Sequence, residues 1–306
     1  MYHGIINVYK EAGYTSHDVV AKLRGICKQK KIGHTGTLDP DAVGVLPVCL
    51  GSGTKACELL TDRKKEYIAR FRLGCVTDTQ DLSGHILEQN PVTVSEHETA
   101  EAIVSFEGES MQVPPMYSAL KVNGKKLYEL ARQGKEVERP ARRITIYEIE
   151  ILGQKHPEYT IRVVCSKGTY IRTLCHDIGQ KLGCGAVMVS LERTRVGEFG
   201  MEDAYRLSKL QALADEGRLH EAVRPVDRLF EDYPDLRVKE ESLRALQNGN
   251  PFKMSDVCFR EEERSRETAD GEQFRVYSHQ GVFFGIYRYE AERKLFLPVK
   301  LFFLSE

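Results

Sequence analysis

The feature that most constrains the fold of this chain is a change of hydrophobic period along its first 200 residues. Residues 65–74, KEYIARFRLG, alternate apolar with wetter positions, which is typical of a β-strand with one face in the core. Residues 16–27 instead space their apolar side chains as an α-helix does, and we expect Ser16 to cap that helix. Strand-like and helix-like segments then alternate without a regular repeat, which predicts an α+β fold.

The end of the chain differs from the part before it because its periodic segments are mostly strand-like. We therefore predict two domains, residues 1–235 and a small β-rich domain at residues 236–306. With 306 residues, 41% of them apolar, the chain can bury a sizeable core. No apolar run is long enough to span a membrane and the first residues do not resemble a signal peptide, so we expect a cytoplasmic protein.

Cysteines and charges narrow the classes of function. The eight cysteines form no CxxC pair and no His/Cys cluster with metal-ligand spacing, so we expect packed thiols and no metal site. The net charge of −1 argues against a general nucleic-acid coat, but residues 1–200 carry +3 and the remainder −4. Such basic side chains can be solvated or can bind phosphates. Four basic clusters are present: Lys22, Arg24, Lys28, Lys30 and Lys31; Arg63, Lys64 and Lys65; Lys121, Lys125 and Lys126; Arg139, Arg142 and Arg143.

A loop between two predicted elements, residues 32–44 or IGHTGTLDPDAVG, places Asp39 and Asp41 among glycines with no lysine or arginine. It lacks the Gly-Lys-Ser/Thr ending of a phosphate-binding loop. Pro40 keeps Asp39 in an extended conformation, and the glycines leave space beside it. The loop could hold a reactive carboxylate facing a cavity or two solvated turn acids. Its own residues do not decide between these interpretations.

The stretch GHTGTLDPDAVGVLPVCLG resembles the signature of the TruB family of pseudouridine synthases, which make pseudouridine 55 in the T-loop of tRNA. Four more blocks resemble that family in its order and spacing: KEYIARFRLG, TDTQDLSG, MYSALKVNGKKLYELARQG and CSKGTYIRTLCHDIGQKLGCG. The resemblance runs from about residue 4 to residue 200, and the tail resembles a PUA-like RNA-binding domain. It implies the pseudouridine synthase fold: a central mixed, largely antiparallel sheet flanked by helices, followed by a small β-rich domain.

The resemblance also implies the catalytic residues. Asp39 matches the nucleophile, and Arg172 matches the cation that keeps it ionised. Tyr67 matches the ring that stacks on a flipped-out uracil and accepts or relays the C5 proton. Without the resemblance, Tyr67 reads as a core residue and Arg172 as part of a surface ion pair. Asp41 matches no functional residue, and we interpret it as a turn acid.

Three further residues are implied to bind the substrate. Tyr170 and Leu191 match residues that line the pocket, although each could also be ordinary core. His34 matches the residue that fills the gap left in the RNA stack, where a loop histidine would otherwise be solvated. The implied partner is tRNA through its T-arm, bound by a monomer. The isomerisation requires no redox step, so we expect no cofactor and no metal.

Some points stay open. Whether Asp39 adds to C6 of the base or acts at C1′ cannot be read from the residues. Glu11 replaces the proline that the family usually has after Lys10, and Glu192 replaces an arginine that often follows Leu191. Alternative functions are a pseudouridine synthase for another RNA site, an RNA-binding or folding factor with an idle active site, and a hydrolase with a carboxylate pair.

Overall fold

The computed structural model describes residues 1–122, 124–258 and 268–303, and its largest element is an eight-stranded sheet. The strand order is β1-β3-β12-β4-β11-β10-β7, with β2 paired to β3. The strands are β1 Gly4–Lys10, β2 Ile32–His34, β3 Val43–Leu50, β4 Lys65–Leu73, β7 Gly108–Gln112, β10 Arg142–Lys155, β11 Glu158–Cys165 and β12 Ala186–Val196. The pairs are antiparallel except for a short parallel contact between β3 and β12. The predicted mixed, largely antiparallel sheet is confirmed.

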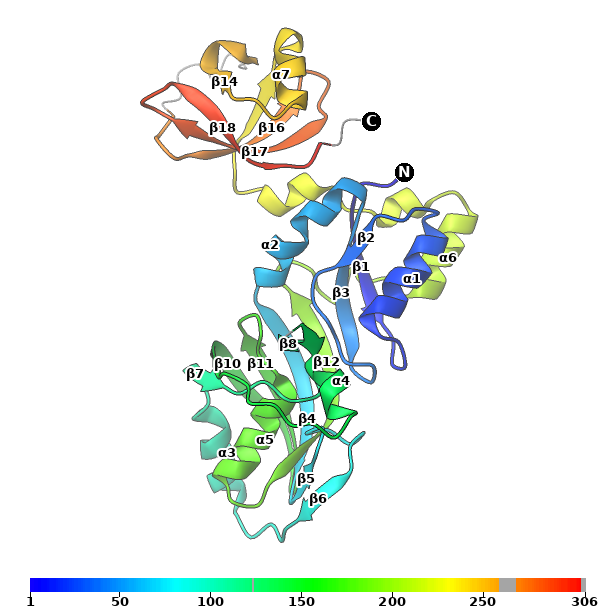
Figure 1. Cartoon of the computed structure of the whole chain (residues 1–306), viewed down its shortest axis with the longest axis vertical. Helices are drawn as coiled ribbons and strands as arrows, with labels where there is room; N and C mark the ends of the chain where they lie inside the picture. The colour runs from blue at the N-terminus through cyan, green and yellow to red at the C-terminus, as the bar shows by residue number, and fades with distance from the viewer. Residues whose placement is uncertain (123, 259–267, 304–306) are drawn as a thin grey trace.

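Helices flank this sheet along its length (Figure 1). They are α1 Ser16–Ile26, α2 Cys57–Asp62, α3 Glu96–Val104, α4 Leu127–Ala131, α5 Ile171–Lys181 and α6 Leu207–Asp215, with single 3-10 turns at Gly51–Ala56, Leu219–Ala222 and Val226–Phe230. Helices α1 and α6 share a core with β1 and β3, in which Leu23, Leu46 and Leu210 are fully buried. Helix α5 shares a second core with β4, β11 and β12. The fold is therefore α+β, as predicted.

Strand β1 is buried on both faces, which explains its nearly continuous apolar sequence. Ile6 and Val8 contact the α1 and α6 side, whereas Ile5 contacts a third core on the opposite side. That third core also contains Leu60 of α2 and Leu229 of the 3-10 turn at Val226–Phe230. Because both faces are covered, β1 and its partner β3 form a rigid base for the loop that precedes β3.

The C-terminal part forms a separate six-stranded sheet in the order β14-β18-β17-β16-β13-β15. Its elements are β13 Asp235–Val238, α7 Leu243–Gln247, β14 Phe252–Lys253, β15 Val257–Cys258, β16 Gln273–Ser278, β17 Phe283–Glu290 and β18 Leu295–Leu301, with 3-10 turns at Glu240–Ser242 and Met254–Asp256. The expected β-rich tail is confirmed, whereas the division at residues 235 and 236 stays a prediction. Phe283 and Phe302 of the tail stack on each other and pack against Phe230 before it.

One local prediction is wrong: Thr15, rather than Ser16, caps α1. The Thr15 side chain accepts from the backbone N–H of Asp18, and the Asp18 carboxylate accepts from that of Thr15. Ser16 lies inside the helix, and its hydroxyl accepts from the backbone N–H of Leu38 at 2.9 Å. Ser16 therefore ties the helix to the loop that carries Asp39.

Two short hairpins complete the described elements: β5 Cys75–Thr77 with β6 Ile86–Gln89, and β8 Lys121–Val122 with β9 Lys125–Lys126. Among the described residues, no helix is both long enough and apolar enough to cross a bilayer.

Candidate active site

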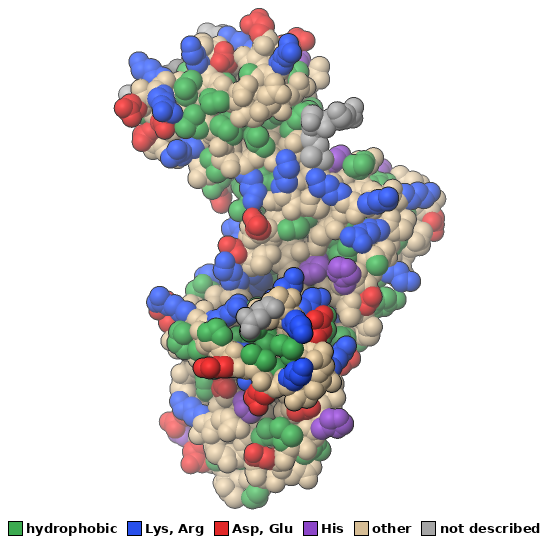
Figure 2. Space-filling model, in the orientation of Figure 1, with side chains coloured by type: hydrophobic (Ala, Val, Ile, Leu, Met, Phe, Trp, Pro, Cys, Tyr) green, Lys and Arg blue, Asp and Glu red, His purple; other side chains and the backbone are tan. Residues whose placement is uncertain are grey.

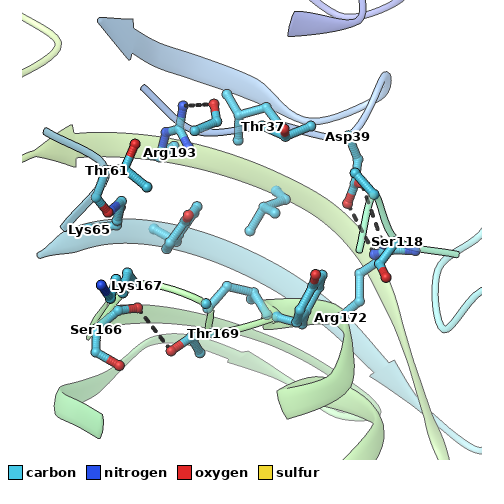
Figure 3. Close-up of a pocket in the computed structure, with 18 of the residues that line it drawn as sticks. Thr37, Asp39, Thr61, Lys65, Ser118, Ser166, Lys167, Thr169, Arg172 and Arg193 are labelled. Carbon is cyan, nitrogen blue, oxygen red and sulfur yellow. Dashed lines mark hydrogen bonds and ion pairs between the residues drawn. The ribbon is translucent and has the colours of Figure 1, made fainter. Parts of the chain in front are cut away.

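A cavity of about 320 Å³ lies where the loop before β3 faces β4, β12 and the start of α5 (Figure 3). Its wall consists of Thr35, Gly36, Thr37, Leu38, Asp39, Thr61, Lys65, Tyr67, Ser118, Ala119, Leu120, Ser166, Lys167, Gly168, Thr169, Tyr170, Ile171, Arg172, Leu191 and Arg193. Five of the six predicted site residues are in this wall. The sixth, His34, is not; it ends β2, where its Nδ1 accepts from the Gly36 N–H at 3.4 Å.

The Asp39 carboxylate and the Arg172 guanidinium form an ion pair at one end of the cavity. Nε of Arg172 lies 3.0 Å from Oδ2 of Asp39, and Nη2 donates to Oδ1 at 3.4 Å. The Arg172 side chain is only 5% exposed, which excludes the alternative of an ordinary surface ion pair. Because two nitrogens contact two oxygens, the pair fixes the orientation of the carboxylate as well as its charge.

A second carboxylate, which the sequence analysis did not identify, holds the far side of the same guanidinium. Nη1 of Arg172 lies 3.4 Å from Oδ2 of Asp81 and donates to the carbonyl of Thr79 at 3.0 Å. Nη2 also donates to the carbonyl of Tyr117 at 2.9 Å. The only sequence signal is that Asp81 belongs to the block TDTQDLSG, one of those that carry the family resemblance. Asp81 thus positions Arg172, which in turn orients Asp39.

The pKa of Asp39 reflects opposing effects. Burial raises its pKa above the usual value, and the Arg172 guanidinium opposes that rise. The Asp81 carboxylate adds to the rise, and the Lys10 ammonium lowers the pKa. The cations beside Asp39 thus favour the charged form that a nucleophile requires, although burial keeps the pKa raised overall.

Lys10 and Ser16 hold the Asp39 loop from behind. The Lys10 side chain is fully buried, and its Nζ donates to the carbonyls of Pro40 at 2.9 Å, Tyr14 at 2.6 Å and Glu11 at 3.1 Å. Burial lowers the pKa of Lys10 to about 8. Lys10 makes these contacts although the residue after it is glutamate rather than proline. Lys10 holds the backbone after Asp39 through Pro40, and Ser16 holds the backbone before it through Leu38.

Asp41 differs from Asp39 in its surroundings. Its side chain is exposed, and it does not line the cavity. Two acids only two residues apart therefore have different positions, one in the cavity wall and one in solvent. This arrangement argues against a carboxylate pair acting together.

Tyr67 and Leu191 reach the cavity from adjacent strands. Tyr67 lies on β4 among alternating buried residues, and Leu191 lies on the neighbouring β12. Both side chains are 8% exposed, so each offers an apolar surface to the cavity. Burial raises the pKa of Tyr67, which keeps the hydroxyl protonated at neutral pH, while the Arg193 guanidinium lowers it.

Tyr170 is the residue that precedes α5, and a buried amide fixes its backbone. The Tyr170 N–H donates to Oε1 of Gln112 at 2.8 Å, and Nε2 of Gln112 donates to the Tyr170 carbonyl at 3.1 Å. Gln112 ends β7 and is 4% exposed. These reciprocal bonds hold the start of α5, and with it Arg172, at the cavity.

The opposite end of the cavity is basic. Figure 3 shows Arg193 and Lys65 away from Asp39 and Arg172. Placing Lys65 in a basic surface cluster was wrong, because its side chain is buried, whereas Arg63 and Lys64 are exposed. Alternation along β4 turns Lys65 to the same face as Tyr67.

Other basic residues do lie on the surface of the N-terminal part. Figure 2 shows Lys and Arg side chains gathered about a hollow near the middle of the visible face. Lys28, Lys30 and Lys31, which follow α1, are exposed, as are Lys121 and Lys125 of the β8–β9 hairpin. A phosphate backbone lying across this face would meet several cations at once.

Comparisons with known proteins identify the family to which this α+β fold and its cavity belong. Residues 24–171 match the TruB family pseudouridylate synthase N-terminal domain, and residues 172–231 match the tRNA pseudouridylate synthase B C-terminal domain. The chain belongs to the TruB family of pseudouridylate synthases. It is therefore an isomerase that converts uridine to pseudouridine in tRNA.

Close relatives support this assignment over nearly the whole chain. A tRNA pseudouridine synthase B of Lachnoclostridium phytofermentans is 50% identical and covers 98% of this chain and 99% of its own length. The corresponding protein of Clostridium acetobutylicum is 48% identical, with 92% and 94% covered. A chain of an H/ACA RNP bound to a substrate RNA containing 2′-deoxyuridine has a TM-score of 0.69 and 25% identity, with 99% of this chain and 86% of that chain covered.

Proposed function

We propose that this enzyme isomerises uridine 55 in the T-loop of tRNA, with Asp39 as the nucleophile acting on a flipped-out base. The observation that carries the proposal is the two-point ion pair of Asp39 with the buried Arg172 at a cavity wall. A nucleophilic carboxylate must be ionised and must face the reacting atoms. Asp39 has a cation at hydrogen-bonding distance and faces the cavity, and both conditions are therefore supported.

The cavity also suits a single base. Its volume of about 320 Å³ can hold one flipped pyrimidine, and the Tyr67 and Leu191 side chains provide apolar contact. We propose that Tyr67 stacks on the base and that its hydroxyl, whose pKa is raised further by burial, relays the C5 proton. Tyr170 completes the wall next to Arg172. The identity of the atom that Asp39 attacks, C6 or C1′, stays open.

The partner that we propose is the T-arm of a tRNA in the cytoplasm, bound by a monomer. The exposed lysines of the N-terminal part would contact phosphates, while the cavity takes up the base. His34, on the strand that leads into the cavity wall, is proposed to occupy the gap in the RNA stack. A function as an RNA-binding factor with an idle site is disfavoured because the ion pair and the aromatic wall are both intact.

The nucleophile is tested by Asp39→Asn, which keeps the size of the side chain and removes its charge. We expect no release of tritium from C5-tritiated uridine in tRNA, because the amide cannot attack. Affinity for tRNA measured by filter binding should stay within about tenfold, or 1.4 kcal/mol. Asp41→Asn is the matched control, since Asp41 is exposed, and it should stay active. Substantial turnover by Asp39→Asn would exclude Asp39 as the nucleophile.

A further inference from the structure

One end of the cavity carries positive charge that the chemistry at Asp39 does not use. Arg193 is 1% exposed and Lys65 is 6% exposed, and both line the cavity. Within the part of the chain that the structure describes, neither forms an ion pair with a carboxylate. Burial of a charge without a counter-charge is unfavourable, so the two cations should face an acceptor that the substrate brings.

Neutral carbonyls hold both cations in place without neutralising them. Nε of Arg193 donates to the carbonyl of Val45 at 2.7 Å, and Nη2 donates to that of Gly36 at 3.4 Å. Nζ of Lys65 donates to the carbonyl of Arg63 at 2.7 Å and to that of Thr61. Burial and the neighbouring Arg193 lower the pKa of Lys65 to about 8. An electron-rich group between the cations would relieve this cost.

The cations lie beside the ring on which the base is proposed to stack. Tyr67 and Arg193 are direct partners across β4 and β12, and Lys65 is two residues before Tyr67 on the same face. Asp39 lies at the other end of the cavity. A uracil stacked on Tyr67, with its glycosidic bond at Asp39, would therefore turn its opposite edge toward Lys65 and Arg193.

The edge of uracil that lies opposite the sugar carries a carbonyl oxygen both before and after the ring turns. The atom opposite N1 in uracil is C4, which carries O4. When the ring has turned so that C5 faces the sugar, the opposite atom is C2, which carries O2. A carbonyl oxygen thus points away from the sugar in the substrate and again in the product.

We propose that Arg193 and Lys65 form a carbonyl-binding subsite, which holds O4 before the uracil turns and O2 afterwards. This subsite rests on the proposed function at Asp39. The N1–C1′ bond breaks with its electron pair on the uracil, a uracil electron pair then forms the C5–C1′ bond, and the C5 proton leaves to a base. No electrons are gained or lost. Between the two bonds the uracil is anionic, and its charge resides partly on O2 and O4.

The same subsite selects uracil over cytosine. Lysine and arginine side chains only donate hydrogen bonds. Cytosine carries an amino group, itself a donor, where uracil carries O4. The subsite would therefore set donors against donors when a cytosine enters, which disfavours the wrong base.

A two-by-two experiment tests the contact between Lys65 and O4. Wild type and Lys65→Met are each given T-arm RNA with uridine, or with the pyrimidin-2-one nucleoside that lacks O4, at the target position, and both nucleosides carry tritium at C5. We expect O4 removal to slow tritium release by wild type at least about tenfold, since a hydrogen bond to a charged group is lost. Lys65→Met should be slow on uridine, and O4 removal should slow it much less than it slows wild type. Lys65→Arg should restore much of the dependence on O4.

Lys64→Met is the matched control, because the Lys64 ammonium lies 3.8 Å from the centroid of the Tyr147 ring and does not line the cavity. It should respond to O4 removal as wild type does. If Lys65→Met does not fold, Arg193→Gln takes its place in the same design. If O4 removal slows tritium release by the same factor in wild type and in Lys65→Met, Lys65 does not contact O4. That result would overturn the subsite and leave Lys65 with a structural role only. Failure of wild type to release tritium from the uridine RNA would overturn the proposed function, and the subsite with it.

Discussion

Arg172 is the residue on which most of the site geometry converges. It contacts the carboxylates of Asp39 and Asp81 and the carbonyls of Thr79 and Tyr117. Asp81 leaves the Asp39 side of the guanidinium free for the two-point contact, which a lysine could not reproduce. Arg172 therefore has two separable effects on Asp39, one through charge and one through orientation.

Substitution at Arg172 separates these effects. In Arg172→Gln the charge that lowers the pKa of Asp39 is lost, so the pKa rises further. Only the ionised carboxylate reacts. The acidic limb of the kcat/KM profile of Arg172→Gln should therefore lie at a higher pH than that of wild type. Arg172→Lys keeps the charge, so the acidic limb of its kcat/KM profile should lie near that of wild type. Both variants should lose about 100-fold in rate at neutral pH through misplacement of the carboxylate.

The pH profiles of kcat/KM for both variants provide the measurement, with melting temperatures as a check on folding. An acidic limb of Arg172→Gln at the wild-type position would show that the guanidinium does not set the ionisation of Asp39.

The sequence predicted the residues that line the cavity better than the residues that hold them in place. Asp39 was distinguished from Asp41 through the family resemblance, because the spacing of the two acids could not decide which one faces a cavity. Asp81, Lys10 and Arg193 were not identified, since their roles depend on contacts between residues far apart in the chain. Lys65 was misassigned because it was grouped by charge with Arg63 and Lys64, although the alternation of residues 65–74 places it on the same face as Tyr67.

At the scale of elements, the contact between β3 and β12 is the junction at which the cavity forms. Gly44 of β3 has φ +108°, and a Cβ at this position would lie 2.2 Å from the carbonyl oxygen of Arg193. The two residues are partners in the sheet's short parallel contact. The close approach requires glycine, and it also places Arg193 beside the cavity.

We therefore expect Gly44→Ala to destabilise the protein by more than about 2 kcal/mol, from backbone strain and from the clash. Gly13→Ala is the matched control, because Gly13 also has a positive φ, +83°, but nothing lies within 4 Å of its Cβ position. It should cost only the strain of about 1–2 kcal/mol. Thermal melting of both variants gives the comparison. Equal losses would mean that β3 and β12 can separate without penalty.

The helix α1 and the strand β4 were well predicted, because a strong periodic pattern marks each of them. The cap of α1 was misplaced by one residue, since Thr15 and Ser16 are equally suitable types and only the bond of Ser16 to Leu38 separates them. The pairing of β3 with β12 could not be predicted, because nothing local indicates which strands meet.

At the scale of the whole molecule, two sheets are joined through an aromatic contact. Phe230 packs against Phe283 and Phe302 of the tail. The cavity lies in the N-terminal sheet, and exposed lysines occur on the same part of the chain. The tail, residues 236–306, carries 12 Lys and Arg against 12 Asp and Glu, and without a net positive charge it is a poor electrostatic anchor for RNA. We therefore assign most phosphate contacts to the N-terminal part, and the choice of base to its cavity.

The central claim is that this enzyme makes pseudouridine 55 in tRNA through Asp39. The most direct test treats unmodified tRNA with the wild-type protein and with Asp39→Asn, and maps every pseudouridine along the product. We predict one new pseudouridine, at position 55 in the T-loop, with wild type and none with the variant. Pseudouridine at another position, or at position 55 with both proteins, would contradict the account.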